Sequence, residues 1–191
     1  AVYAAEHFTG QKLPEAVIAD THRKLKRDLS NVAIIGMPGC GKSTIGRALA
    51  KTLGKTYVDL DEVIEKNTGM PIPDIFAREG EASFRKYESQ AVAEISKQTR
   101  QVIACGGGVI KSPANTRALR QNGPVLWVRR PLEALATGGR PLSKGGAALK
   151  QLETERTPLY EAASTVVLEN NGSLTAAVDK AVQLFEADER L

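Results

Sequence analysis

The chain lacks long apolar runs and has very few cysteines. No apolar stretch approaches the roughly 20 residues of a membrane-spanning helix, and the first residues have neither the apolar core nor the cleavage pattern of a secretory signal. Only two of the 191 residues are cysteines, Cys40 and Cys105, and they do not have the spacing of metal ligands. These absences argue against a membrane partner and a zinc site. They predict a protein of the reducing cytoplasm.

A large excess of one charge is also missing. The formal net charge is +4, which suits binding of anionic small molecules. Binding of nucleic acid normally calls for a dense basic face, so we expect no nucleic-acid partner. A chain of 191 residues is most simply one domain, and it is long enough to bury a substantial core.

Past Asn31, short β-rich runs alternate with helical patterns. Such alternation is typical of a parallel sheet that helices cover on both faces. Strands are predicted at residues 32–35, 56–59, 101–105, 125–128 and 165–168. Helices are predicted at residues 44–53, 73–98 with a break near Gly80, 147–163 and 174–189. The prediction is an α/β fold of three layers around a five-stranded parallel sheet.

Residues 1–30 differ in character from the rest. Val2, Ala5 and Phe8, with Gly10 beyond them, predict a short helix and its C-cap. The basic run at residues 20–27 predicts a second helix, and we interpret its charges as a solvated face. We therefore divide the chain into a helical N-terminal extension or linker, residues 1–30, and a domain of residues 31–191.

A glycine-rich loop at residues 36–44 joins the first predicted strand to a helix. Its pattern is glycine, four residues, then Gly-Lys-Ser, in the strand-to-helix setting of a phosphate-binding loop. The glycines let backbone N–H groups face the phosphates, Lys42 can reach the β- and γ-phosphates, and Ser43 can bind magnesium. A simple turn is the alternative. The expected nucleotide contacts are Gly39, Cys40, Gly41, Lys42, Ser43 and Thr44.

Two carboxylates follow the second predicted strand. Asp59 and Asp61 stand at its carboxyl end, where ligands bind in sheets of this kind. One can support magnesium, and the other can accept a hydroxyl proton during phosphoryl transfer. Alternatively, Asp61 only caps a helix that begins at Glu62.

Glycines and arginines suggest where a second substrate binds. Gly106, Gly107 and Gly108 end the third predicted strand and allow a ligand to press against bare backbone, although they could form only a flexible turn. Arginine binds carboxylate or phosphate at two points, but any single arginine could equally form a surface salt bridge. The arginines in suggestive settings are Arg85, Arg140 and Arg156.

Taken together and in order, these motifs resemble shikimate kinase, a small P-loop family of the nucleoside-monophosphate-kinase-like group. The resemblance covers residues 31 to about 187. It rests on the ordered set as a whole: residues 36–44, 59–61, 75–76, 80–81, 84–85, 106–108, 140–142 and 156–160.

The resemblance implies transfer of the γ-phosphate of ATP to the 3-hydroxyl of shikimate, a step in making aromatic amino acids through chorismate. Residues 39–44 would wrap the β-phosphate, with Lys42 in a catalytic role. Ser43 and, through water, Asp59 would hold Mg²⁺. Asp61 would bind the shikimate hydroxyls and orient or deprotonate the one that attacks. Substrate contacts would come from Asp61, Arg85, Gly106, Gly107, Gly108 and Arg156, and a mobile lid would bring the catalytic Arg140 to the phosphates of ATP.

Some features depart from the family or extend beyond it. Residues 135–138 lack the arginine that many members carry ahead of the lid, so nucleotide preference is open. Residues 1–10 resemble the closing helix of shikimate dehydrogenase, which suggests that the chain is the kinase part of a dehydrogenase–kinase fusion. The kinase domain itself is expected to be monomeric.

Cys40 and Cys105 are interpreted as packing residues, with redox sensitivity as the alternative. Alternative functions are a gluconate-type small-molecule kinase and a non-catalytic nucleotide-binding regulatory module.

Overall fold

A parallel sheet forms the centre of the protein. The computed structural model describes residues 2–135 and 146–188. The strands are β1 (Val32–Ile35), β2 (Thr56–Asp59), β3 (Gln101–Ala104), β4 (Val125–Arg129) and β5 (Val166–Glu169). All neighbouring strands pair in parallel, in the spatial order β2-β3-β1-β4-β5. The predicted five-stranded parallel sheet is confirmed, and no bound of β3, β4 or β5 differs from expectation by more than a single residue.

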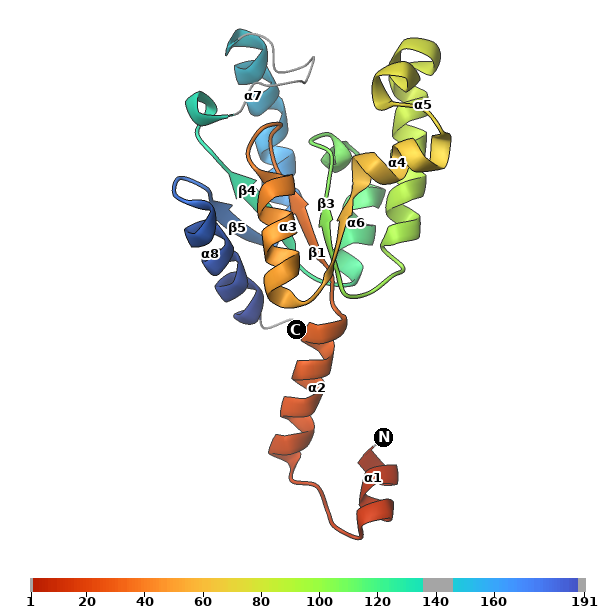
Figure 1. Cartoon of the computed structure of the whole chain (residues 1–191), viewed down its shortest axis with the longest axis vertical. Coiled ribbons are helices and arrows are strands. Elements are labelled where there is room, and N and C mark those ends of the chain that lie inside the picture. Colours follow the sequence, from red (N-terminus) through yellow and green to blue (C-terminus); the bar gives the residue numbers. More distant parts are fainter. Residues whose placement is uncertain (1, 136–145, 189–191) are drawn as a thin grey trace.

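Helices cover both faces of the sheet (Figure 1). Helices α3 (Lys42–Leu53) and α8 (Leu174–Glu186) pack together on one face, and α5 (Ile72–Ile95) and α6 (Pro113–Gln121) pack together on the other. Every residue of β1 and β3 is buried between these layers, which explains why both strands are almost uniformly apolar. The three-layer prediction is therefore confirmed. Among the described residues, no helix is both long and apolar enough to cross a membrane.

Four further elements lie around the carboxyl end of the sheet. Helices α4 (Leu60–Thr68) and α7 (Gly146–Ala163) stand on opposite sides of it in Figure 1. Two short 3-10 helices, Val109–Lys111 and Leu132–Ala134, complete this end.

Helix α6 is missing from the sequence-based prediction, and α4 appears in it only as the alternative helix that begins at Glu62. Helix α6 has clear start signals, because the Ser112 side chain accepts a hydrogen bond from Asn115 N and Pro113 occupies the first turn. Its polar composition concealed these signals. The break predicted near Gly80 is confirmed, since Gly80 interrupts α5 with φ 79° and ψ 175°.

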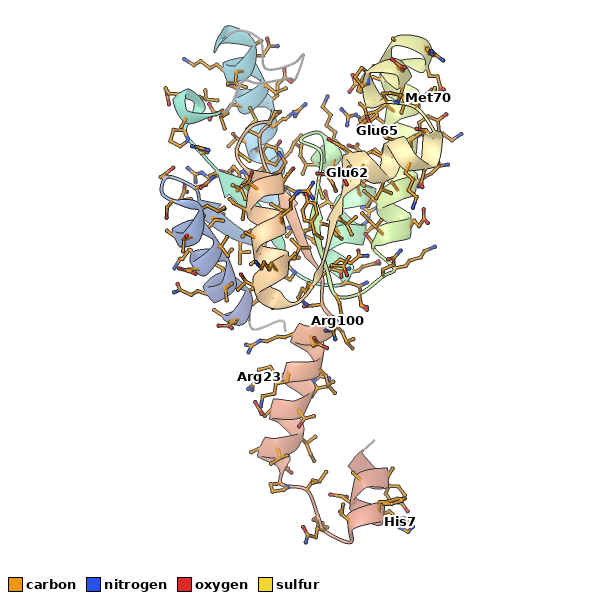
Figure 2. The ribbon with its side chains drawn as sticks, in the orientation of Figure 1. His7, Arg23, Glu62, Glu65, Met70 and Arg100 are labelled. Carbon is orange, nitrogen blue, oxygen red and sulfur yellow. The ribbon has the colours of Figure 1, made fainter. Side chains whose placement is uncertain are left out.

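The N-terminal extension consists of α1 (Val2–Thr9) and α2 (Glu15–Leu29), and α2 projects away from the sheet (Figure 1). No residue of α2 is buried. Lys55 holds its C-terminal end, because Nζ donates to the carbonyl oxygens of Arg27, Asp28 and Ser30 at 2.9, 2.9 and 2.7 Å. Arg100, labelled in Figure 2, pairs with Asp28 at the same junction. Lys55 thus satisfies carbonyl groups that the end of a helix leaves without partners.

Replacing Lys55 with methionine should loosen the last turn of α2. Loss of these hydrogen bonds should cost about 1 to 2 kcal/mol locally, which corresponds to roughly 5- to 30-fold faster amide exchange. Hydrogen exchange by mass spectrometry over residues 24–30 measures this. Lys51→Met, an exposed change on α3, is the matched control. Equal exchange in both variants would show that Lys55 does not anchor α2.

Candidate active site

The glycine-rich loop leaves β1 and enters α3 in a conformation that requires glycine. Gly39 and Gly41 have φ values of 79° and 101°, a region that side chains disfavour. Gly36 has φ 147°, and a Cβ on it would lie only 2.4 Å from the Val128 carbonyl oxygen. The local sequence therefore explains the conformation of the loop at Gly39 and Gly41, and close packing against β4 explains Gly36.

Lys42 curls back over this loop. Its side chain is buried, and Nζ donates to the carbonyl oxygens of Gly36 and Met37 at 3.0 and 2.9 Å. The loop is also tied to the end of β5, because Asn170 Nδ2 donates to the Cys40 carbonyl oxygen at 2.8 Å. The ammonium group and the start of α3 thus bring positive charge to one small region, which suits an anion.

Asp59 and Ser43 meet beside the loop. Asp59 Oδ2 accepts hydrogen bonds from Ser43 Oγ at 3.3 Å and from the Tyr57 hydroxyl at 2.9 Å. Asp59 Oδ1 accepts from the backbone N–H of Asp61 at 3.1 Å, so Asp59 is the N-cap of α4. The alternative in which Asp61 caps a helix starting at Glu62 is therefore wrong, because α4 already begins at Leu60.

The three glycines after β3 each lie against a candidate site side chain. A Cβ would lie 2.9 Å from Asp61 Oδ1 at Gly106, and 2.5 Å from Arg85 Nη1 at Gly108. At Gly107 it would lie 2.9 Å from Arg156 Nη1. The absence of side chains at these positions thus lets the carboxylate and both guanidinium groups approach the same stretch of backbone.

The same stretch also adjoins the phosphate-binding loop. A Cβ at Gly107 would lie 3.3 Å from Pro38 Cδ and 3.4 Å from the Gly36 carbonyl oxygen. Strand order explains this proximity, because β3 lies between β1 and β2 and all three end at the same edge of the sheet. The candidate nucleotide residues and the candidate substrate residues therefore form one continuous site.

Arg85 is held in place by two glutamates. Its Nη2 lies 3.0 Å from Glu81 Oε1, and its Nη1 lies 2.9 Å from Glu88 Oε2. Burial raises the pKa of Glu88, which is only 1% exposed, and the neighbouring Arg85 opposes that shift. Sequence reasoning named Glu81 only as part of the motif at residues 80–81 and missed Glu88. Their spacing of four and three residues from Arg85 on a helix was the signal that could have revealed them.

Arg156 reaches the site from α7, on the far side from α5. It is 3% exposed, and its Nε has no hydrogen-bond partner among the described residues. A buried cation with an unused donor is costly unless a ligand or solvent supplies an acceptor. Arg156 is thus well suited to bind an anionic group.

Some expected features stand apart from this arrangement. Arg140 and the proposed lid lie in residues 136–145, outside the described part of the chain, so their roles stay predictions.

Both cysteines are buried and unpaired, and burial raises the pKa of the Cys105 thiol. A buried thiol of raised pKa is a poor nucleophile, which favours the packing interpretation for Cys105.

Comparisons with known proteins agree with this geometry. The family model described as shikimate kinase matches residues 38–186. The shikimate kinase of Nitrosomonas europaea is 41% identical over 162 residues, which cover 80% of this chain and 77% of that protein. A solved structure of shikimate kinase from Acinetobacter baumannii in complex with shikimate has a TM-score of 0.80 and 34% identity, and the match covers 87% of this chain and 98% of that one.

A gluconokinase from Sinorhizobium meliloti is more distant. Its TM-score is 0.50 at 20% identity, over 83% of this chain and 93% of that one, which shows similarity of fold alone. The shikimate kinase matches cover most of the chain at 34% to 41% identity, and they therefore decide between a shikimate kinase and a gluconokinase. The chain belongs to the shikimate kinase family.

Proposed function

We propose that this protein transfers the γ-phosphoryl group of ATP to the 3-hydroxyl of shikimate, giving shikimate 3-phosphate and ADP on the route to chorismate. One observation carries the proposal. A carboxylate, Asp61, and two guanidinium groups, Arg85 and Arg156, line bare glycine backbone that directly adjoins the phosphate-binding loop. Shikimate has hydroxyl groups for the carboxylate and a carboxylate for the arginines.

On the donor side, residues 39–44 bind the phosphates of ATP through backbone N–H groups. Lys42 neutralises charge on the β- and γ-phosphates from its place over the loop. If the predicted lid closes, Arg140 adds positive charge and water is excluded from the reacting phosphate.

Ser43 and Asp59 fit a Mg²⁺ ion. Their oxygen atoms face each other at 3.3 Å, and Mg²⁺ prefers oxygen ligands. Mg²⁺ at nucleotide sites is usually bound by one or two protein oxygens, and water and phosphate oxygens complete its coordination. When bound, Mg²⁺ would neutralise phosphate charge.

On the acceptor side, Arg85 and Arg156 bind the substrate carboxylate and fix the ring. Asp61 then positions the 3-hydroxyl and accepts its proton as the oxygen attacks the γ-phosphorus. The bond from that phosphorus to the bridging oxygen of ADP breaks in the same transfer. Such a reaction depends mainly on positioning and on positive charge, and this site supplies both.

A coupled assay for ADP release tests the proposal with shikimate, with gluconate and with no acceptor. We expect ADP release when shikimate is the acceptor, and none with gluconate or without an acceptor. Preferential turnover of gluconate would favour a gluconate-type kinase. Nucleotide binding without turnover of any acceptor would favour a regulatory module.

Replacing Arg85 with alanine should raise the KM for shikimate about 10- to 100-fold, because a charge-assisted pair of hydrogen bonds is lost. The KM for ATP should change little. Steady-state kinetics with each substrate varied separately measures both values. Arg78→Ala removes an exposed arginine from the same helix and serves as the control. An unchanged shikimate KM would rule out Arg85 as a carboxylate contact.

We further propose that the extension is the end of a preceding dehydrogenase domain. The resemblance of residues 1–10 to the closing helix of shikimate dehydrogenase supports this. So does the exposure of Tyr3 and Phe8, at 81% and 95%, because a preceding domain would cover such side chains. The native reading frame upstream of Ala1 tests the idea, and a start codon immediately before Ala1 would contradict it.

A monomeric kinase domain and a cytoplasmic location stay predictions. Light scattering checks the first, and cell fractionation checks the second.

A further inference from the structure

Tyr160 lies beneath the acceptor side of the site and has no role in the reaction described above. It is 1% exposed and lies on α7, four residues after Arg156 and therefore on the same helix face. Its hydroxyl donates to the Gly107 carbonyl oxygen at 2.7 Å. That bond joins α7 to the loop after β3, two segments that are 53 residues apart in the chain.

The Arg156 guanidinium lies against the same backbone group, because a Cβ on Gly107 would lie 2.9 Å from Arg156 Nη1. A tyrosine hydroxyl has one hydrogen to donate, and here that hydrogen goes to the Gly107 carbonyl oxygen. The hydroxyl thus fixes the Gly107 backbone at the point where Arg156 approaches it.

The tyrosine ring is itself held firmly. It stacks on Trp127 of β4, with ring centroids 5.7 Å apart and an angle of 23° between the planes. Trp127 is 5% exposed, and the Arg129 guanidinium lies 5.2 Å from its ring centroid. Since the ring is buried and stacked, the hydroxyl has little freedom to move away from Gly107.

We propose that Tyr160 is a positioning residue for the acceptor substrate, which holds the Gly107 backbone against the Arg156 guanidinium in the arrangement that shikimate requires. This inference rests on the proposed function. It predicts that loss of the hydroxyl weakens shikimate binding more than ATP binding, because in the described part of the chain the hydroxyl hydrogen-bonds to Gly107 and to no residue of the predicted ATP set.

The test is Tyr160→Phe, which keeps the ring and its stack on Trp127. We expect the KM for shikimate to rise about 3- to 15-fold, the range for one buried hydrogen bond. The KM for ATP should stay within about twofold, since the lost hydrogen bond is made to Gly107 and not to a predicted ATP contact. Tyr87→Phe is the matched control, because it removes a hydroxyl that bonds to Glu79 on the surface of α5 at 2.8 Å.

A binding measurement separates positioning from a general loss of structure. Trp127 is the only tryptophan of the chain, so its emission reports directly on the stack. Titration with shikimate alone should change this emission and give a Kd that rises in Tyr160→Phe by the same factor as KM. An unchanged shikimate KM in an active variant would overturn the inference, and so would equal rises in both KM values. Failure of the unsubstituted protein to phosphorylate shikimate would instead defeat the proposed function.

Discussion

Replacing Asp61 with asparagine is expected to lower kcat for shikimate phosphorylation by about 100- to 10,000-fold, the range for loss of a general base. Asparagine has almost the same shape but cannot accept the hydroxyl proton. Asp61 follows the N-cap of α4, and its Oδ1 would lie 2.9 Å from a Cβ at Gly106, so the side chain is directed at the glycine backbone. Neither feature depends on its charge. The fold and the KM for ATP should therefore survive.

Steady-state kinetics and thermal unfolding together check this prediction. Glu62→Gln is the matched control. Glu62, which is labelled in Figure 2, is the next residue on α4, and it pairs with Arg47 on the surface at 3.1 Å. It should retain near-normal kcat. Wild-type turnover in Asp61→Asn would show that Asp61 is neither the base nor the group that positions the hydroxyl.

The second large effect is expected at Arg156. Replacement by methionine should lower kcat/KM for shikimate by roughly 30-fold to a few thousand-fold, because truncation of one partner in a buried charge pair costs about 2 to 5 kcal/mol. This effect should exceed that of Arg85→Ala. Arg85 is partly exposed and already paired with two glutamates, whereas Arg156 is 3% exposed and has an unused Nε among the described contacts.

Arg156→Lys distinguishes charge from geometry. Lysine keeps the positive charge but lacks the planar fork, so it should recover only part of the activity. Arg117→Met is the control, since Arg117 is an exposed arginine on α6. If Arg156→Met and Arg117→Met had equal kinetics, Arg156 would not bind the substrate carboxylate.

Much of the fold could be predicted because its signals are local. The five strands follow from short apolar runs, and the break in α5 follows from Gly80. Helix α6 was missed because its polar composition outweighed the start signals at Ser112 and Pro113. In each case the deciding information lay within a few neighbouring residues.

The candidate site divides in the same way. The roles proposed for Asp61 and Arg156 came from motifs. Tyr160 stands in the same motif as Arg156, residues 156–160, but the motif does not show that folding brings its hydroxyl to Gly107, which is 53 residues away. The spacing of Glu88 from Arg85 fits a contact on one helix, but it does not show that folding buries this glutamate. Contacts between distant segments, and burial, depend on the folded chain.

The phosphate-binding loop is specified locally by the order of amino acids, because positive φ values at Gly39 and Gly41 and the spacing to Lys42 are properties of one short segment. What faces that loop depends on the folded chain as a whole. The strand order places β3 between β1 and β2, which brings the triple glycine beside both the loop and Asp61. The order of strands in a sheet depends on packing between distant segments, and no local pattern of residues encodes it.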